Sequence, residues 1–163
     1  MAGPARTTVD DASRAELGLL LRRLTIELDA VGEHFAAQHG LGRTDVRALI
    51  AVMDAARAGS ALTAGALGAA VGLSSASVTA LVDRLERAGH LHRVRDTTDR
   101  RRVVLEMSEA TTAAGAEFFG GLQRDLMVAM AGFTDDELAV VRRFLGEMTD
   151  VIVTHQRPAP DQA

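Results

Sequence analysis

Arginine side chains are the residues of this sequence with the clearest chemical use, and they are concentrated in one stretch. Between Arg84 and Arg102, seven arginines stand against three acidic residues, an excess of four positive charges. The whole chain carries a net charge of −4, so the rest of it has an excess of eight negative charges. An acidic chain with one basic stretch indicates a confined site for an anionic ligand rather than a general affinity for polyanions.

Short hydroxyl side chains precede the arginines, at the start of a helix predicted between Ser74 and Gly89. The first turn of such a helix presents unpaired N–H groups and the positive end of the helix dipole, which suit a phosphate group. The hydroxyls can reach phosphates or base edges, although Ser74 also fits the role of an ordinary N-cap. The hydroxyl-bearing residues are Ser74, Ser75, Ser77 and Thr79. This segment therefore predicts a second surface for contact with an anionic ligand.

Other kinds of chemistry find no support in the residue pattern. The chain has no cysteine, which excludes disulfides, thiolate metal sites and oxidant-sensing thiols, and its five histidines are too scattered for a metal motif. Its glycines lack the lysine and the serine or threonine of a phosphate-binding loop, and its serines lack the pattern of a nucleophile elbow. We therefore expect no enzyme activity, no metal and no cofactor.

Composition indicates one globular domain. The chain has 163 residues, of which 47% are hydrophobic and 25% charged, and this length allows about two-thirds of the unfolded surface to be buried. Tryptophan and tyrosine are absent, which disfavours an aromatic stacking platform for single-stranded nucleic acid. The start of the sequence has no apolar signal region, and no later run reaches the roughly 18 apolar residues of a membrane span. We expect a cytoplasmic protein without a membrane partner.

The hydroxyls and the first arginines fall on the second helix of a predicted helix-turn-helix. Thr63 is the expected N-cap of a short helix, Gly72 forms a tight turn after it, and Ser74 caps the helix that Gly89 terminates. Thr44 is the expected N-cap of the helix that precedes them. A short helix, a glycine turn and a capped helix together make this motif.

The remaining arginines fall on a predicted β-hairpin with a charged tip. After Gly89 the apolar period changes to two, so that Val103, Leu105 and Met107 alternate with residues such as Val104. Residues 96–99 supply the turn signal. The hairpin completes a lobe that we assign to residues 44–107.

Long amphipathic helices flank this lobe on both sides. The segments 12–43 and 108–155 carry apolar residues at alternating spacings of three and four, and Thr134–Glu137 forms a complete capping box. From periodicity alone, these apolar seams face either the rest of the domain or a second subunit. Residues 1–11 and 156–163 are expected to be disordered tails.

The order of these elements resembles that of the MarR-type family of bacterial transcriptional regulators, from about Leu17 to Val153. The fold class is therefore expected to be mainly α with a small β-hairpin wing (α+β), a winged helix-turn-helix flanked by long dimerisation helices. The residues that carry the resemblance are Leu62-Thr63, Leu67, Gly72-Leu73-Ser74, Val78-Thr79, Leu81 to Leu85, Gly89, Leu91, Arg93 and Asp99-Arg100-Arg101.

The resemblance implies a sequence-specific regulator of transcription that binds double-stranded DNA. In such a protein the flanking helices of two chains interlock as a homodimer, and the two winged lobes bind a near-palindromic operator. Repression is the commoner action in the family, and it is what we expect here.

The resemblance also suggests how individual residues contact DNA. By position, Arg101 is the wing arginine that enters the minor groove, with Asp99 orienting the loop, whereas Arg84 either contacts a phosphate or pairs with an acid such as Asp99. Ala76 and Ala80 depart from the family pattern, which often has a polar and a basic residue there. We therefore hypothesise that DNA shape and minor-groove contacts carry more of the specificity. The expected DNA-contacting residues are Ser74, Ser75, Ala76, Ser77, Thr79, Ala80, Arg84, Arg93, Asp99, Arg100, Arg101 and Arg102.

Members of this family commonly bind small aromatic or anionic effectors in a crevice between the dimer helices and the DNA-binding lobe. Each residue of the candidate wall also fits a role in the hydrophobic core. These residues are Phe35, His39, Leu49, Val52, Met53 and Phe118.

One alternative function stays open. A winged domain that has lost DNA binding would serve as a protein-interaction module or antagonist, and the few polar groups on the recognition helix are compatible with that role. The arginines at 100–102 argue against it, because such a module does not need their charge. Salt dependence separates the two functions, since phosphate contacts weaken steeply as the salt concentration rises.

Overall fold

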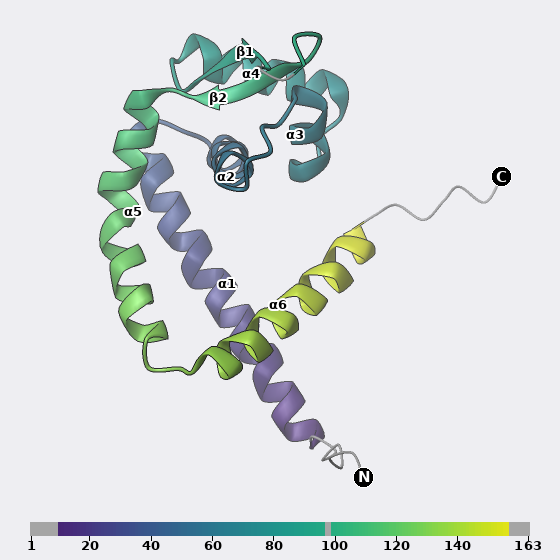
Figure 1. Ribbon diagram of the computed structural model, residues 1–163, viewed down its shortest axis with the longest axis vertical. Helices are drawn as coiled ribbons and strands as arrows, with labels where there is room; N and C mark the ends of the chain where they lie inside the picture. The colour runs from purple at the N-terminus through teal and green to yellow at the C-terminus, as the bar shows by residue number, and fades with distance from the viewer. Residues whose placement is uncertain (1–9, 97–98, 157–163) are drawn as a thin grey trace, which may run out of the picture. The chain divides into compact units, whose positions relative to one another are not determined.

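The computed structural model describes residues 10–96 and 99–156 and consists of α-helices and one antiparallel hairpin (Figure 1). The predicted fold class, mainly α with a small β-hairpin wing, is confirmed. The chain divides into two compact units, residues 1–114 and 115–163. In chain order the elements are α1 (Asp11–His39), α2 (Arg43–Arg57), α3 (Ala64–Val71), α4 (Ser75–Arg87), β1 (Leu91–Arg95), β2 (Val103–Met107), α5 (Glu109–Met130) and α6 (Asp135–Gln156).

The helix-turn-helix, α3 and α4, begins and turns as the sequence predicts. The Thr63 hydroxyl accepts a hydrogen bond from the Ala66 N–H at 3.2 Å, and Ser74 accepts one from the Ser77 N–H at 3.3 Å. Between the helices Gly72 adopts a left-handed conformation with φ of 73°, which glycine reaches without a steric cost. Within the described ranges no single helix is long and apolar enough to cross a membrane. The helices α3 and α4 meet that criterion only when they are taken together, and they are bent by 109° at the break between them.

A close contact between α3 and α4 depends on Gly68. A Cβ atom added there would lie 3.1 Å from Cγ1 of Val78 and 3.2 Å from the carbonyl oxygen of Leu73. Both distances are shorter than an ordinary van der Waals contact between such atoms. The missing side chain of Gly68 therefore sets how closely the two helices approach.

The start of α2 differs from the prediction. The helix begins at Arg43 with Gly42 as its N-cap, two residues before the expected start at Asp45 with Thr44 as the cap. The reason is that the Asp45 carboxylate reaches back and accepts a hydrogen bond from the Gly42 N–H at 2.9 Å. The Asp45 carboxylate, and not the Thr44 hydroxyl, is therefore the side-chain group that caps the start of α2.

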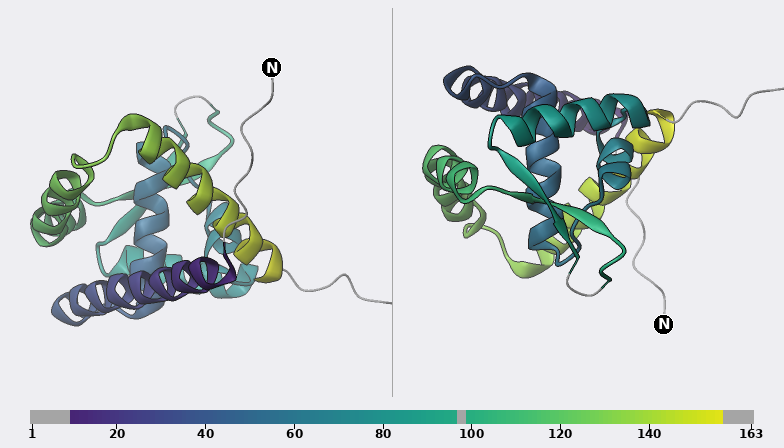
Figure 2. Two further views of the ribbon diagram at one scale, coloured as in Figure 1. Left: turned by 90° about the horizontal axis from the view of Figure 1, so that it is seen from below. Right: turned by 90° about the horizontal axis from the view of Figure 1, so that it is seen from above.

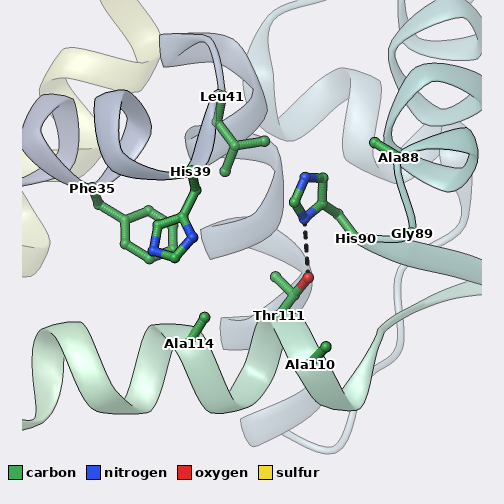
Figure 3. A pocket seen from close by; sticks show the side chains of 9 residues that line it. All are labelled: Phe35, His39, Leu41, Ala88, Gly89, His90, Ala110, Thr111 and Ala114. Carbon is green, nitrogen blue, oxygen red and sulfur yellow. Dashed lines mark hydrogen bonds between the residues drawn. The ribbon is translucent and has the colours of Figure 1, made fainter.

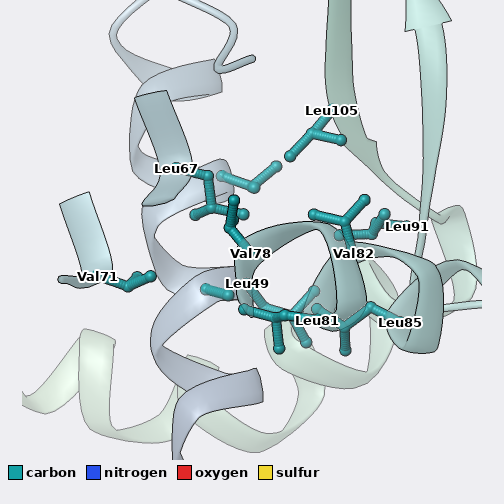
Figure 4. Close-up of a cluster of buried hydrophobic side chains, with 11 residues drawn as sticks. Leu49, Leu67, Val71, Val78, Leu81, Val82, Leu85, Leu91 and Leu105 are labelled. Atoms are coloured by element: carbon teal, nitrogen blue, oxygen red, sulfur yellow. The ribbon is translucent and has the colours of Figure 1, made fainter. Parts of the chain in front are cut away.

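One hydrophobic core joins α2, α3 and α4 to both strands of the hairpin (Figure 4). In Figure 1 the hairpin lies across α2 and α3. The side chains of Leu67, Leu85 and Leu91 come from three different elements and are almost fully buried. The buried members of the cluster are Ala48, Leu49, Val52, Leu67, Val71, Val78, Leu81, Val82, Leu85, Leu91 and Leu105.

The hairpin pairs β1 with β2 in antiparallel register, with Arg93 opposite Leu105, and its strands are strongly twisted (Figure 2). Both amides of this pair point away from the partner strand: the Arg93 N–H donates to Oε1 of Glu86 at 3.1 Å, and the Leu105 N–H donates to the Leu62 carbonyl at 2.8 Å. Each edge of the hairpin is thus hydrogen-bonded to a neighbouring segment of the chain.

The burial along β2 departs from the predicted alternation. Val103 is 48% exposed and Val104 only 3%, although the sequence places Val103 with Leu105 on the inner face. Val104 lies opposite Val94, which is itself half-buried, so this second face of the hairpin is also partly covered. The predicted turn at 96–99 includes two residues outside the described ranges.

The long helix α1 exposes most of its apolar side chains. Phe35 and Ala36, near its C-terminal end, are its buried residues. Leu21 and Val31 are half-buried. The exposed large apolar residues of the helix are Leu17, Leu19, Leu20, Leu24, Ile26 and Leu28. Much of the predicted apolar seam is therefore exposed to solvent.

In the second unit, α6 runs away from α5 instead of packing back along it (Figure 1). The predicted capping box is confirmed, because the Thr134 N–H donates to Oε2 of Glu137 at 2.8 Å and the Glu137 N–H donates to the Thr134 hydroxyl at 3.3 Å. The exposed large apolar residues of this unit are Leu122, Leu126, Met127, Val128, Met130, Phe133, Val140, Val141, Leu145, Val151, Ile152 and Val153.

The outer helices extend one residue beyond the expected boundaries. Asp11 begins α1 and Gln156 ends α6, although the sequence predicts disorder for 1–11 and 156–163. Asp11 pairs with Arg14 at 2.7 Å, and an acidic residue in the first turn suits the helix dipole. Apart from Asp10, which precedes α1, the other residues of both predicted tails lie outside the described ranges.

Candidate nucleic-acid interface

The N-terminal half of α4 presents small side chains to its surroundings. Ser75, Ala76, Thr79 and Ala80 are exposed, as are the Ser74 and Ser77 side chains. The hydroxyls of Ser74 and Ser77 lie 2.9 Å apart, and the Thr79 hydroxyl donates to the Ser75 carbonyl at 2.8 Å. Three of the four predicted hydroxyls thus already make hydrogen bonds within the helix. Few polar groups remain on this surface for direct readout of bases.

The tip of the wing is organised by Asp99. Its carboxylate accepts a hydrogen bond from the Arg101 N–H at 3.0 Å, and its carbonyl accepts one from the Arg102 N–H at 2.9 Å. Arg100, Arg101 and Arg102 are exposed, and Arg102 also lies 3.4 Å from the Asp96 carboxylate. The backbone of the loop is therefore held while its arginines extend outward, and their contact with DNA stays a prediction.

Arg84 pairs with an acid, which is one of its two predicted roles, but the acid is Asp45 of α2 and not the example Asp99. The guanidinium lies 2.5 Å from Oδ1 of Asp45, whose side chain is only 8% exposed. The other oxygen of that carboxylate accepts from Gly42, so one aspartate links the start of α2 to the middle of α4. The Arg84 side chain is still 56% exposed and can also face a phosphate.

Arg93, an expected DNA contact, is occupied by acids of α4. Its guanidinium forms an ion pair with Glu86 and a second one with Asp83, the latter at 2.6 Å. The hydrogen bond with Asp83, followed by the one with Glu86, raises the pKa of Arg93 above its usual value and outweighs the opposite effect of partial burial. Sequence reasoning did not single out Asp45, Asp83 or Glu86 for these roles.

A cavity of about 220 Å³ lies in the first unit, between the end of α1, the turn after α4 and the start of α5 (Figure 3). The Phe35 and His39 rings contact each other with centroids 4.3 Å apart, and Nδ1 of His90 lies 3.1 Å from the Thr111 hydroxyl. The lining residues are Phe35, His39, Leu41, Ala88, Gly89, His90, Ala110, Thr111 and Ala114.

Only part of the predicted effector wall lines this cavity. Phe35 and His39 do, whereas Leu49 and Val52 belong to the buried core of the winged lobe. Met53 is half-buried and does not line the cavity, and Phe118 lies in the second unit, where it packs edge-on against Phe119. No cluster of three or more histidine, aspartate or glutamate side chains suited to a metal ion occurs within residues 10–96 and 99–156.

The comparisons with known proteins agree with this architecture. A model described as the MarR family matches residues 39–102. The chain is 38% identical over 121 residues to the uncharacterised HTH-type transcriptional regulator YcgE of Bacillus subtilis, covering 73% of this chain and 76% of that protein. It is 27% identical over 138 residues to the HTH-type transcriptional repressor YetL of the same organism, covering 85% of this chain and 81% of YetL.

A solved structure shows the same fold. The structure of a MarR family protein from Bacillus stearothermophilus superposes with a TM-score of 0.61 and 28% sequence identity. The match covers 89% of this chain and 99% of that one, so it includes the flanking helices as well as the winged lobe.

Proposed function

Since the chain belongs to the MarR family of transcriptional regulators, we propose that it is a repressor that binds a near-palindromic operator in double-stranded DNA as a homodimer. The expectation that it is not an enzyme is confirmed, because its relatives are regulators of transcription. The observation that carries the proposal is the pairing of an exposed recognition helix, α4, with a wing tip whose arginines extend outward while Asp99 holds their backbone.

Each of these two surfaces has a role in the proposed complex. The start of α4 enters the major groove with its small side chains, and Arg101 enters the adjacent minor groove, where the narrow groove of A·T-rich DNA concentrates negative potential. Since α4 carries few polar groups, DNA shape contributes a large share of the specificity. Arg100 and Arg102 supply phosphate contacts, which fix the position of the lobe on the duplex.

Dimerisation is supported by the exposed apolar residues of α1, α5 and α6. A single chain that exposes Leu17, Leu24 and Leu28 on one helix, and Val141, Leu145 and Ile152 on another, leaves a large apolar surface in water. A second copy of the chain can cover it, because two-fold pairing buries the same patch on both subunits. The two recognition helices then read equivalent half-sites about one turn of DNA apart.

The cavity beside Phe35 and His39 supports binding of a small aromatic or anionic effector that releases DNA. Its aromatic rings suit an apolar ring, and the His90 and Thr111 side chains provide polar groups. Benzoate is a suitable probe. It should release labelled DNA from the wild type but not from Ala114→Leu, in which a larger side chain fills the cavity.

DNA binding is tested by selecting duplexes from a randomised pool with the purified protein, alongside DNA from upstream of its own coding sequence. Fluorescence anisotropy then compares the selected duplex with a scrambled one across a salt series, and sedimentation gives the stoichiometry. Steeply salt-dependent binding of one dimer to a two-fold symmetric sequence supports the proposal. Absence of binding to any duplex at low salt refutes it and favours a protein-interaction module.

A further inference from the structure

Arg93 provides a polar attachment of the wing to the recognition helix, in addition to the hydrophobic core that both share. Its backbone N–H donates to one oxygen of the Glu86 carboxylate, and its guanidinium donates to the other. A second guanidinium nitrogen donates to Asp83 at 2.6 Å. Three hydrogen bonds thus connect one residue of β1 to two acids of α4. All three are charge-assisted because a carboxylate accepts each of them, and the two from the guanidinium are also ion pairs.

The backbone of the wing brings Arg93 into this position. Arg93 and Leu105 form a pair whose amides point outward from the hairpin, so the Arg93 N–H is directed at α4. Asp83 and Glu86 are three residues apart and therefore lie on one face of the helix. With its side chain only 31% exposed, Arg93 is enclosed by its partners more than the exposed arginines of the wing tip are.

We infer that Arg93 is a positioning residue that fixes the wing to α4 through Glu86 and Asp83, and that it does not contact DNA. This inference rests on the proposed function. The contacts with Glu86 and Asp83 set the offset between the major-groove helix and the arginines of the wing tip. Without them the wing samples other positions, and the apparent affinity for DNA falls by the fraction of molecules in the competent arrangement.

Neutralising Glu86 or Asp83 distinguishes the positioning role of their contacts with Arg93 from the repulsion between their charges and DNA. Glu86→Gln and Asp83→Asn each remove a negative charge near a polyanion, which by charge alone tightens binding. The positioning role predicts the opposite, a loss of about tenfold in affinity for the selected duplex, which corresponds to a competent fraction of roughly one tenth. Glu106→Gln is the matched control, because Glu106 is an exposed acid of the same hairpin outside these contacts. It should bind as tightly as the wild type or more tightly.

Substitutions of Arg93 complete the test. Arg93→Gln should weaken binding at least as much as Glu86→Gln, because it also loses the contact with Asp83. Adding Glu86→Gln to Arg93→Gln should cause little further loss, since the contact between the two side chains is already gone. Arg93→Lys keeps the charge but not the planar group that engages both carboxylates, and should behave like Arg93→Gln. The salt dependence of binding should be unchanged in all of them, whereas loss of a phosphate contact lowers the slope by about one. The inference is overturned if Arg93→Gln lowers the slope while Glu86→Gln binds at least as well as the wild type.

Hydrogen exchange in the free protein gives a readout without DNA. Amides of residues 93–96 and 99–104 should exchange faster in Glu86→Gln and Arg93→Gln than in the wild type or Glu106→Gln, because the outer part of the wing loosens while Leu91 and Leu105 stay in the core. Unchanged exchange overturns the inference. If the wild type binds no duplex, the proposed function fails, and exchange alone then decides whether Arg93 holds the wing.

Discussion

The contact between α3 and α4 at Gly68 allows a paired prediction within one helix. Gly65 and Gly68 both lie in α3, but a Cβ at Gly65 would have no atom within 4 Å, whereas at Gly68 it would lie 3.1 Å from Val78 and 3.2 Å from the Leu73 carbonyl. Replacing glycine by alanine in a helix stabilises it by roughly 0.5–1 kcal/mol. Gly65→Ala should therefore raise the free energy of unfolding by about that amount.

At Gly68 the same gain in the free energy of unfolding is opposed by the cost of overpacking. The Leu73 carbonyl belongs to the turn of the motif and cannot rotate away as a flexible side chain does, so α3 and α4 must separate. Overpacking of this kind costs about 1–3 kcal/mol, which leaves Gly68→Ala less stable than the wild type by up to about 2.5 kcal/mol. Gly68→Ala should in any case be less stable than Gly65→Ala by about 1–3 kcal/mol.

Urea unfolding followed by circular dichroism measures both variants, at one protein concentration because association with a partner changes the apparent stability. The midpoint should rise for Gly65→Ala and fall for Gly68→Ala, with an unchanged slope. A Gly68→Ala protein as stable as Gly65→Ala would refute the reasoning, since it would mean that the two helices separate at no cost.

Three further predictions concern single side chains. Arg101→Ala should weaken binding to the selected duplex severely and lower the salt slope by about one, while the melting temperature stays within about a degree; equal affinity of both proteins would exclude the minor-groove role. Asp45→Ala should lower the free energy of unfolding by about 1–3 kcal/mol, because both Gly42 and Arg84 lose their partner, and Asp45→Asn, which keeps an acceptor for Gly42, should lose less in the same urea experiment. Hydrogen bonds from the Thr134 backbone and hydroxyl lower the pKa of Glu137, so its stabilising effect is present at neutral pH and is lost as the pH falls through the lowered pKa. The difference in urea midpoint between the wild type and Glu137→Ala should therefore shrink in acid, and a constant difference would contradict this.

Helix starts were largely predictable because both partners of a cap lie within one turn of sequence. Thr63, Ser74 and Thr134 each accept from an N–H three residues further on, and the structure has all three hydrogen bonds. The start of α2 was misplaced because Thr44 and Asp45 are neighbours that both favour helix starts. The choice fell to the aspartate, which also pairs with Arg84, 39 residues away along the chain.

The partners of the arginines could not be predicted from spacing. A guanidinium at position 93 is equally suited to a phosphate or a carboxylate, and only the packing of β1 against α4 brings Asp83 and Glu86 to it. The burial of Val104 also depends on tertiary packing. An apolar period of two predicts a hairpin with one buried face, whereas both faces of this hairpin are partly buried. The cavity joins residues of α1, of the turn after α4 and of α5, so it too depends on tertiary packing.

The hydrogen bonds at the two edges of the hairpin also lower the tendency of the protein to aggregate at high concentration. A two-stranded sheet with open edges is a template for strands of other molecules, and that route leads to aggregation. Here the outward amides of Arg93 and Leu105 already donate to Glu86 and Leu62. An additional strand would have to displace a carboxylate on one side and a backbone carbonyl on the other. The wing can therefore extend its arginines into solvent without offering these amides to a second sheet.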